Sequence, residues 1–202
     1  MFMHGGAAAR CLLQRLYFFR ARARGVCISL ILLPCVLHAG EILDSSVTHD
    51  GVVYRLSISA RMDAPLAVVY RSITDFSNLS AINPAIEESQ VLESQGAGQS
   101  RVRSVIKVCI LVFCKRVEQV QDVTLVDGRT VVARMVPGAG DFRAGLARWE
   151  LTATGDATEL HFTEVFEPDF WVPPVIGPWL IEKKLVREVA ETATYIEMQT
   201  GG

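Results

Sequence analysis

The sequence has little of the residue chemistry that marks metal, phosphate or hydrolase sites. Its 202 residues include four histidines and five cysteines, and only His49 and His161 follow residue 39. These two histidines are far apart and lack the paired spacing of metal ligands. Gly138 and Gly140 precede a strand-like segment, whereas a phosphate-binding glycine loop opens a helix. No serine indicates a hydrolase triad. The sequence therefore predicts no metal site, no cofactor and no catalytic residue of these classes.

A hydrophobic run long enough to span a membrane is also missing. The uncharged apolar stretch at residues 26–37 would reach about 18 Å as a helix, whereas a bilayer core is about 30 Å thick. Five arginines precede this stretch and Ala39 follows it. That order is typical of a secretory signal peptide. We predict a signal peptide over residues 1–39, cleaved after Ala39, in a protein exported to a bacterial periplasm. The alternative is an uncleaved N-terminal anchor.

Positive charge is scarce after residue 39. The whole chain has a formal net charge of −2, but residues 40–202 hold 15 basic and 22 acidic residues, a charge of −7. An acidic domain is a poor partner for nucleic acid or for anionic lipid surfaces. With 50% hydrophobic and 8% aromatic residues, the chain is not disordered, and its length suits one domain after a leader.

Only two cysteines, Cys109 and Cys114, follow residue 39. On a straight strand they would be about 16 Å apart, too far for a disulfide, which needs Cα atoms within about 7 Å. A two-residue turn at Leu111 and Val112 would instead place the cysteines opposite each other in a hairpin. An oxidising compartment favours the disulfide, which we therefore predict. Two buried free thiols are the alternative.

Hydrophobic periodicity predicts the elements. A strand over residues 52–61 precedes two short helices. The first helix has Asp63 as its N-cap and Pro65 in its first turn, and the second covers residues 75–81. Further strands are expected at 86–93, 100–110, 113–126, 129–136, 143–153 and 158–167, followed by a long helix over 179–199. In this helix Ile181, Leu185, Val189, Ala193 and Ile196 form an apolar stripe, and Glu182, Lys183, Arg187, Glu188 and Glu191 occupy the other side.

This order predicts an α+β fold with a curved antiparallel sheet of about seven strands wrapped around the long C-terminal helix. The sheet must bury one face, and the helix is the only element large enough to cover it. A tapered space is expected between them, either filled by side chains or available to a ligand.

The order of elements resembles the START-like, helix-grip superfamily. Within it, the chain is most similar to the polyketide cyclase/dehydrase and lipid-transport group, which includes the coenzyme-Q-binding START proteins. The segments that carry the likeness are residues 64–76, Asn83-Pro84, Val91-Leu92, residues 149–151, residues 158–162 and the proline-punctuated helix from Pro173. The resemblance covers residues 50–198 and implies a START-like domain over 40–202. Members bind an apolar molecule between sheet and helix, and some close aromatic rings. The predicted leader departs from the quinone-binding members, which work inside mitochondria or the bacterial cytoplasm.

Strand alternation identifies candidates for lining the space. Leu160, Phe162, Glu164 and Phe166 share one face of their strand, and we expect this face to line the cavity together with Trp149, Leu185 and Val189. In apolar surroundings Glu164 would have a raised pKa and could orient a ligand or act as a general acid. The alternative is an ion pair with Arg148 or Arg134. His161 lies on the opposite, solvated face.

Two apolar segments are candidates for the rim of the cavity. One is the predicted hairpin tip formed by Ile110, Leu111, Val112 and Phe113, and the other contains Trp171 and Trp179. They could form a gate or make transient contact with a membrane, because tryptophan suits a bilayer interface as well as a core. The alternative is packing under the long helix. Arg101, Arg103 and Lys107 share a face that we expect to be solvated.

Three functions are compatible with these residues. The leading hypothesis is binding or transport of a hydrophobic small molecule or lipid, without catalysis. The second is an enzyme of the cyclase/dehydrase type that uses Glu164 as an acid-base group. The third is an interaction protein whose cavity is filled.

Overall fold

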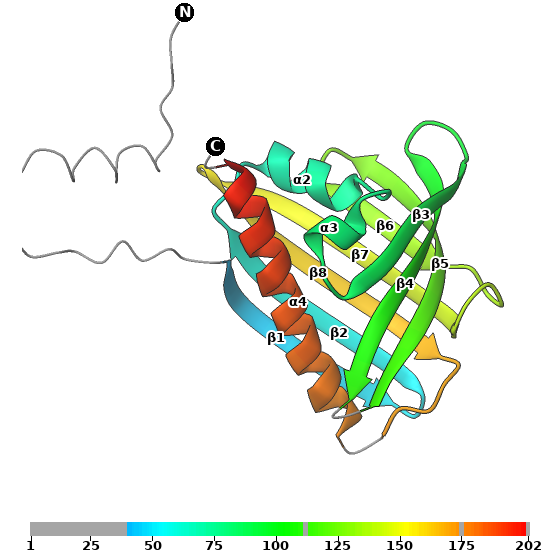
Figure 1. Cartoon of the computed structure of the whole chain (residues 1–202). Helices are drawn as coiled ribbons and strands as arrows, with labels where there is room; N and C mark the ends of the chain where they lie inside the picture. The colour runs from blue at the N-terminus through cyan, green and yellow to red at the C-terminus, as the bar shows by residue number, and fades with distance from the viewer. Residues whose placement is uncertain (1–39, 111–112, 174–175, 201–202) are drawn as a thin grey trace, which may run out of the picture.

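The computed structural model describes residues 40–110, 113–173 and 176–200, which form eight antiparallel strands and three helices. The strands are β1 (Glu41–Asp50), β2 (Val53–Met62), β3 (Ile86–Ser94), β4 (Gln99–Ile110), β5 (Phe113–Asp127), β6 (Thr130–Met135), β7 (Phe142–Thr154) and β8 (Ala157–Pro168). The helices are α2 (Leu66–Thr74), α3 (Leu79–Ile82) and α4 (Gly177–Thr200). All strands join one sheet in the order β1-β2-β8-β7-β6-β5-β4-β3 (Figure 1).

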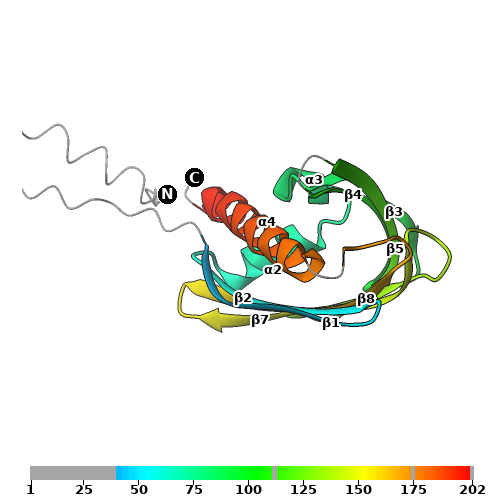
Figure 2. The same ribbon diagram turned by 90° about the horizontal axis from the view of Figure 1, so that it is seen from below.

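The sheet curves around the helices, as the view from below shows (Figure 2). Helix α4 crosses the concave face and packs mainly against β1 and β2. The short helices α2 and α3 lie on the same side of the sheet, beside α4 (Figure 1). This arrangement confirms the predicted α+β helix-grip fold.

The strand count of about seven was too low, because β1 was not predicted. Its inward side chains are Ile42 and Val47, which pack against the core. A β-bulge between Ile42 and Asp44 shifts the register against β2 and breaks the period-two pattern. Two serines follow the bulge, so β1 resembles a polar linker in sequence. Gly51, with φ of 57°, supplies the positive φ of the turn that joins β1 to β2.

The predicted start of the first helix also needs correction. Helix α2 begins at Leu66, its N-cap position is Pro65, and no side chain caps it. Asp63 is used elsewhere: its side chain pairs with Arg61 at 3.6 Å, and its backbone N–H donates to Glu197 Oε1 at 2.9 Å. The second helix, predicted over residues 75–81, is shorter than expected: α3 covers only Leu79–Ile82.

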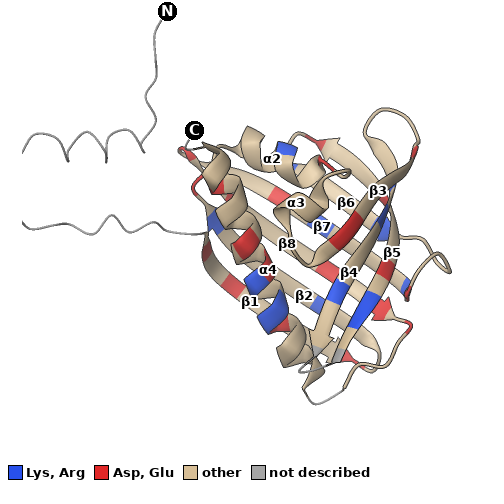
Figure 3. Cartoon of the chain, in the orientation of Figure 1, with Lys and Arg blue, Asp and Glu red and all other residues tan. Residues whose placement is uncertain are grey.

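Acidic and basic residues are interleaved along β3, β4 and β5 (Figure 3). Arg101 pairs with Asp122 at 2.7 Å, and Arg103 pairs with both Glu118 at 2.6 Å and Glu88 at 3.0 Å. Ion pairs at a protein surface contribute little to stability. The basic residues on β4 thus lie on a solvated face, as expected. Among the described residues, no helix is long and apolar enough to cross a membrane.

Candidate ligand-binding cavity

A cavity of about 250 Å³ lies between the concave face of the sheet and the helices. Every strand except β1 contributes to its wall, together with α2, α3, the segments that follow these two helices, and α4. Most lining residues are apolar. The polar ones are Asn83, Ser104, Gln119, Gln121, Glu164, Glu188 and Thr192.

Six of the seven residues selected by strand and helix periodicity line this cavity: Trp149, Leu160, Phe162, Glu164, Leu185 and Val189. Phe166 does not, and the prediction for it is corrected. Its ring stacks on Tyr54 with centroids 5.5 Å apart and meets Phe142 edge-on at 5.7 Å. Alternation assigns a side chain to a face of the strand, but it does not say how far along the strand the cavity extends.

An aromatic pair forms part of the apolar wall. Trp149 on β7 lies directly opposite Phe162 on β8, and their ring centroids are 4.8 Å apart. Neighbouring positions on β6 are filled by Val131 and Ala133, which are both buried. Such a wall offers a ligand apolar contact area without polar groups that would need partners.

Glu164 lies on the cavity side of β8. Its neighbours in register are Leu56 on β2 and Ala147 on β7, neither of which can pair with a carboxylate. Burial, and secondarily the nearby charge of Glu188, raises the pKa of Glu164 to about 7. The alternative ion pair is not formed: Glu164 pairs with neither Arg148 nor Arg134, and Arg148 pairs instead with Glu150 at 2.9 Å. Near neutral pH such a carboxyl can donate or accept a proton.

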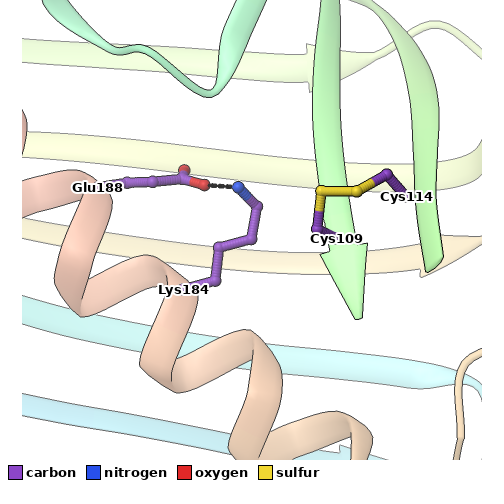
Figure 4. Close-up of a disulfide and its surroundings, with 4 residues drawn as sticks. All are labelled: Cys109, Cys114, Lys184 and Glu188. Carbon is purple, nitrogen blue, oxygen red and sulfur yellow. Dashed lines mark ion pairs between the residues drawn. A yellow bond between two sulfur atoms is a disulfide. The ribbon is translucent and has the colours of Figure 1, made fainter. Parts of the chain in front are cut away.

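Glu188 is a second cavity carboxylate that the sequence analysis had placed on the solvated side of the helix. It forms an ion pair with Lys184, one turn earlier on α4 (Figure 4). Its Oε1 atom is buried and has no hydrogen bond of acceptable geometry within the described residues, so Lys184 provides charge neutralisation only. Helical periodicity missed Glu188 because it identifies only the apolar stripe of α4. The helix faces both the sheet and the cavity, so its inward side includes residues outside that stripe.

Ser104, Gln119 and Gln121 form a polar patch on adjacent strands. Ser104 on β4 lies opposite Gln119 on β5, and Gln121 follows on the same face of β5. Ser104 and Gln121 are 2% and 8% exposed, which is unusual for such residues. The signal was present in the sequence: two glutamines lie on the face of β5 that also carries Val117 and Val123.

Two of the predicted rim residues, Trp171 and Trp179, lie close to the start of α4 in the sequence. Trp171 is 79% and Trp179 is 59% exposed, so neither is packed under the helix. Cys109 and Cys114 are joined by a disulfide, with Cα atoms 4.0 Å apart at paired positions of β4 and β5 (Figure 4). The backbones of Ile110 and Phe113 pair, as the predicted turn requires. Leu111 and Val112 lie outside the described residues.

Within the described ranges, no group of three or more histidine, cysteine, aspartate or glutamate residues could hold a metal ion. His161 is exposed, and its Nδ1 lies 3.0 Å from the Ser59 hydroxyl. His49 stacks on Tyr54 with ring centroids 5.6 Å apart. Neither histidine is among the residues that line the cavity.

Several solved structures share this fold at low sequence identity. The Zhui aromatase/cyclase from Streptomyces sp. R1128 is 16% identical with a TM-score of 0.58, covering 73% of this chain and 93% of that one. TTHA0849 from Thermus thermophilus is 21% identical with a TM-score of 0.56, covering 72% and 96%. A START superfamily protein from Mycobacterium smegmatis is 18% identical with a TM-score of 0.56, covering 72% and 96%. At these identities the likeness shows the fold alone.

A comparison with curated proteins finds no match. Residues 54–197, which make up most of the chain, match the family described as polyketide cyclase / dehydrase and lipid transport. The match begins within β2, so β1 lies outside it. The resemblance identified from the sequence is confirmed. This chain belongs to the polyketide cyclase / dehydrase and lipid transport family.

Proposed function

We propose that this protein binds a hydrophobic small molecule or lipid in the cavity between the sheet and α4. The observation that carries the proposal is the cavity itself, which combines an apolar wall around Trp149 and Phe162 with a few polar groups. Ligand sites in proteins have this composition and commonly measure about 300–1,000 Å³. A cavity of about 250 Å³ therefore suits a small ligand, or one end of a longer one.

The test uses two neighbouring positions on β6. Val131 lines the cavity, whereas Val132 points to the other face of the sheet. Val131→Phe should fill the space, and Val132→Phe should leave it open. We expect an extracted apolar molecule, identified by mass spectrometry, from the wild type and Val132→Phe but not from Val131→Phe. No extracted molecule and no binding of apolar fluorescent probes by the wild type would contradict the proposal.

A cyclase/dehydrase reaction is the second candidate, and Glu164 is the observation that favours it. A carboxyl that lines an apolar cavity and has a pKa of about 7 is suited to proton transfer at neutral pH. The expected result is turnover of a poly-β-keto substrate that Glu164→Gln abolishes. Unchanged turnover in this variant would exclude Glu164 as the acid-base group.

We further propose that the domain acts after export, with the leader removed after Ala39. Gly40 N–H donates to Glu197 Oε2 at 3.3 Å. After cleavage this nitrogen would be an ammonium group, and the hydrogen bond would become an ion pair. A Cβ atom at Gly40 would come within 2.3 Å of Ala193 Cβ, so the position requires glycine. Intact mass measurement of periplasmic protein should give a chain that starts at Gly40. A full-length chain held in the membrane fraction would support the anchor instead.

A further inference from the structure

We propose that the ligand of this cavity has a basic amine attached to an apolar body, and that the protonated amine pairs with Glu164. This inference rests on the proposed binding function and specifies the class of ligand. It follows from the charges that line the cavity and from their partners.

The charges in the cavity wall are unbalanced. Within the described ranges, the lining residues include two carboxylates, Glu164 and Glu188, and no lysine, arginine or histidine. Lys184 neutralises Glu188 from the preceding turn of α4. Glu164 has neither an ion pair nor a hydrogen bond to any described residue. One carboxylate is therefore left without a cation.

The described elements packed around Glu164 provide no cation that could pair with its carboxylate. On β2 and β7, the residues in register with it are Leu56 and Ala147, which do not titrate. The titratable group facing it from α4 is Glu188, whose negative charge disfavours the ionised form of Glu164. An ionised carboxylate in such surroundings is costly unless a cation pairs with it. A bound ammonium group would supply that cation.

The charges of the lining residues also disfavour other classes of ligand. A fatty acid or a phosphate would bring a further negative charge to a wall without a cationic side chain. A neutral ligand could accept a hydrogen bond from protonated Glu164, but it could not pair with the ionised carboxylate. The acidity of residues 40–202, with a formal charge of −7, also favours the approach of a cation over that of an anion.

The remaining polar groups suit an ammonium group as well. Ser104, Gln119 and Gln121 also line the cavity, and their side-chain oxygens can accept N–H groups of a ligand. Trp149 offers an aromatic face to which a cation is attracted. Phe162 beside it gives the apolar body a surface to pack against.

The test compares three probes that share one naphthalene ring system: naphthylmethylamine, naphthylmethanol and naphthoate. Affinities are measured by calorimetry at pH 8 on the purified chain. We expect the amine to bind roughly tenfold more tightly than the alcohol, and the carboxylate to bind most weakly. Glu164→Gln should remove the advantage of the amine over the alcohol. Glu159→Gln is the matched control, because Glu159 lies on β8 but on the opposite face, and it should preserve that advantage.

A pH series on the wild type gives a readout that depends on no variant. Glu164 ionises as the pH rises through about 7, while the amine stays protonated. The ratio of amine to alcohol affinity should therefore increase from pH 5.5 to pH 8.5.

The outcomes separate the two proposals. Equal binding of amine and alcohol by the wild type would overturn the amine proposal and leave hydrophobic binding standing. An amine preference that persists in Glu164→Gln would overturn the pairing with Glu164. If the wild type binds none of the three probes, the proposed binding function itself fails.

Discussion

The two halves of the space between sheet and helices are built differently. In the closed half, where α4 approaches the sheet closely, Ile58, Ala60, Val69, Ala193 and Ile196 are fully buried. In the hollow half, under β4–β8, inward side chains line the cavity. Small residues occur where the helix is closest: Gly40 has no room for a Cβ atom beside Ala193. The comparison indicates that close packing at one end of α4 secures the fold, so that the other half can remain open for a ligand.

Truncating one isoleucine in each half should give the largest contrast. Ile58→Ala removes atoms from fully packed surroundings, and we expect it to lower the free energy of unfolding by about 2–5 kcal/mol. Ile106→Ala is the matched variant, because Ile106 borders space that is already empty, and its cost should lie below that range. Urea unfolding of both variants measures the difference. Equal losses would contradict the division into a closed and a hollow half.

The second prediction concerns pH and the carboxyl group of the hollow half. Burial raises the pKa of Glu164 from 4.5 to about 7, so the folded state retains a proton that the unfolded state releases above pH 4.5. The stabilisation due to this proton is complete below pH 4.5 and is lost as the pH rises to about 7. The loss amounts to about 3 kcal/mol.

Glu164→Gln removes this pH dependence. The wild type should therefore lose stability relative to the variant between pH 4.5 and pH 8, as measured by urea unfolding at intervals of half a pH unit. Glu159→Gln on the other face of β8 is expected to follow the wild type. Parallel profiles for wild type and Glu164→Gln would show that Glu164 is solvated, and would remove the main polar feature of the hollow half.

The sequence predicted the fold more completely than it predicted the lining of the cavity. Alternation on β8 placed Phe162 and Glu164 on the face that lines the cavity, because a strand exposes alternate residues to each face. The same rule failed for Phe166, since the end of the cavity depends on where α4 lies. Glu188 was missed because a charged residue on a helix is usually solvated, and only the tertiary structure shows the space beside it. Strand β1 was missed because its bulge breaks the alternation.

The disulfide provides a smaller test, at the edge of the hollow half. It closes a loop of six residues, and its removal in Cys109→Ser with Cys114→Ser should cost about 2 kcal/mol of stability. Lys115 follows Cys114 in β5, and its Nζ atom lies 4.3 Å from the centroid of the Phe170 ring. Loss of the disulfide should therefore also loosen the segment before α4. Hydrogen exchange of residues 168–173 measures this, and unchanged exchange would show that the hairpin end and this segment are independent.

The smallest effect on stability is expected at Trp171, which belongs to neither half. Its side chain is 79% exposed, so Trp171→Ala should change the free energy of unfolding by less than about 0.5 kcal/mol. Trp149→Ala is the informative partner, because Trp149 packs on Phe162 in the cavity wall and its loss should weaken both stability and ligand binding. If Trp171→Ala slows or accelerates ligand release while leaving the fold intact, the exposed tryptophan acts as part of a gate to the hollow half. Unchanged release rates would remove Trp171 from the gate and leave access to the cavity to other segments of the rim.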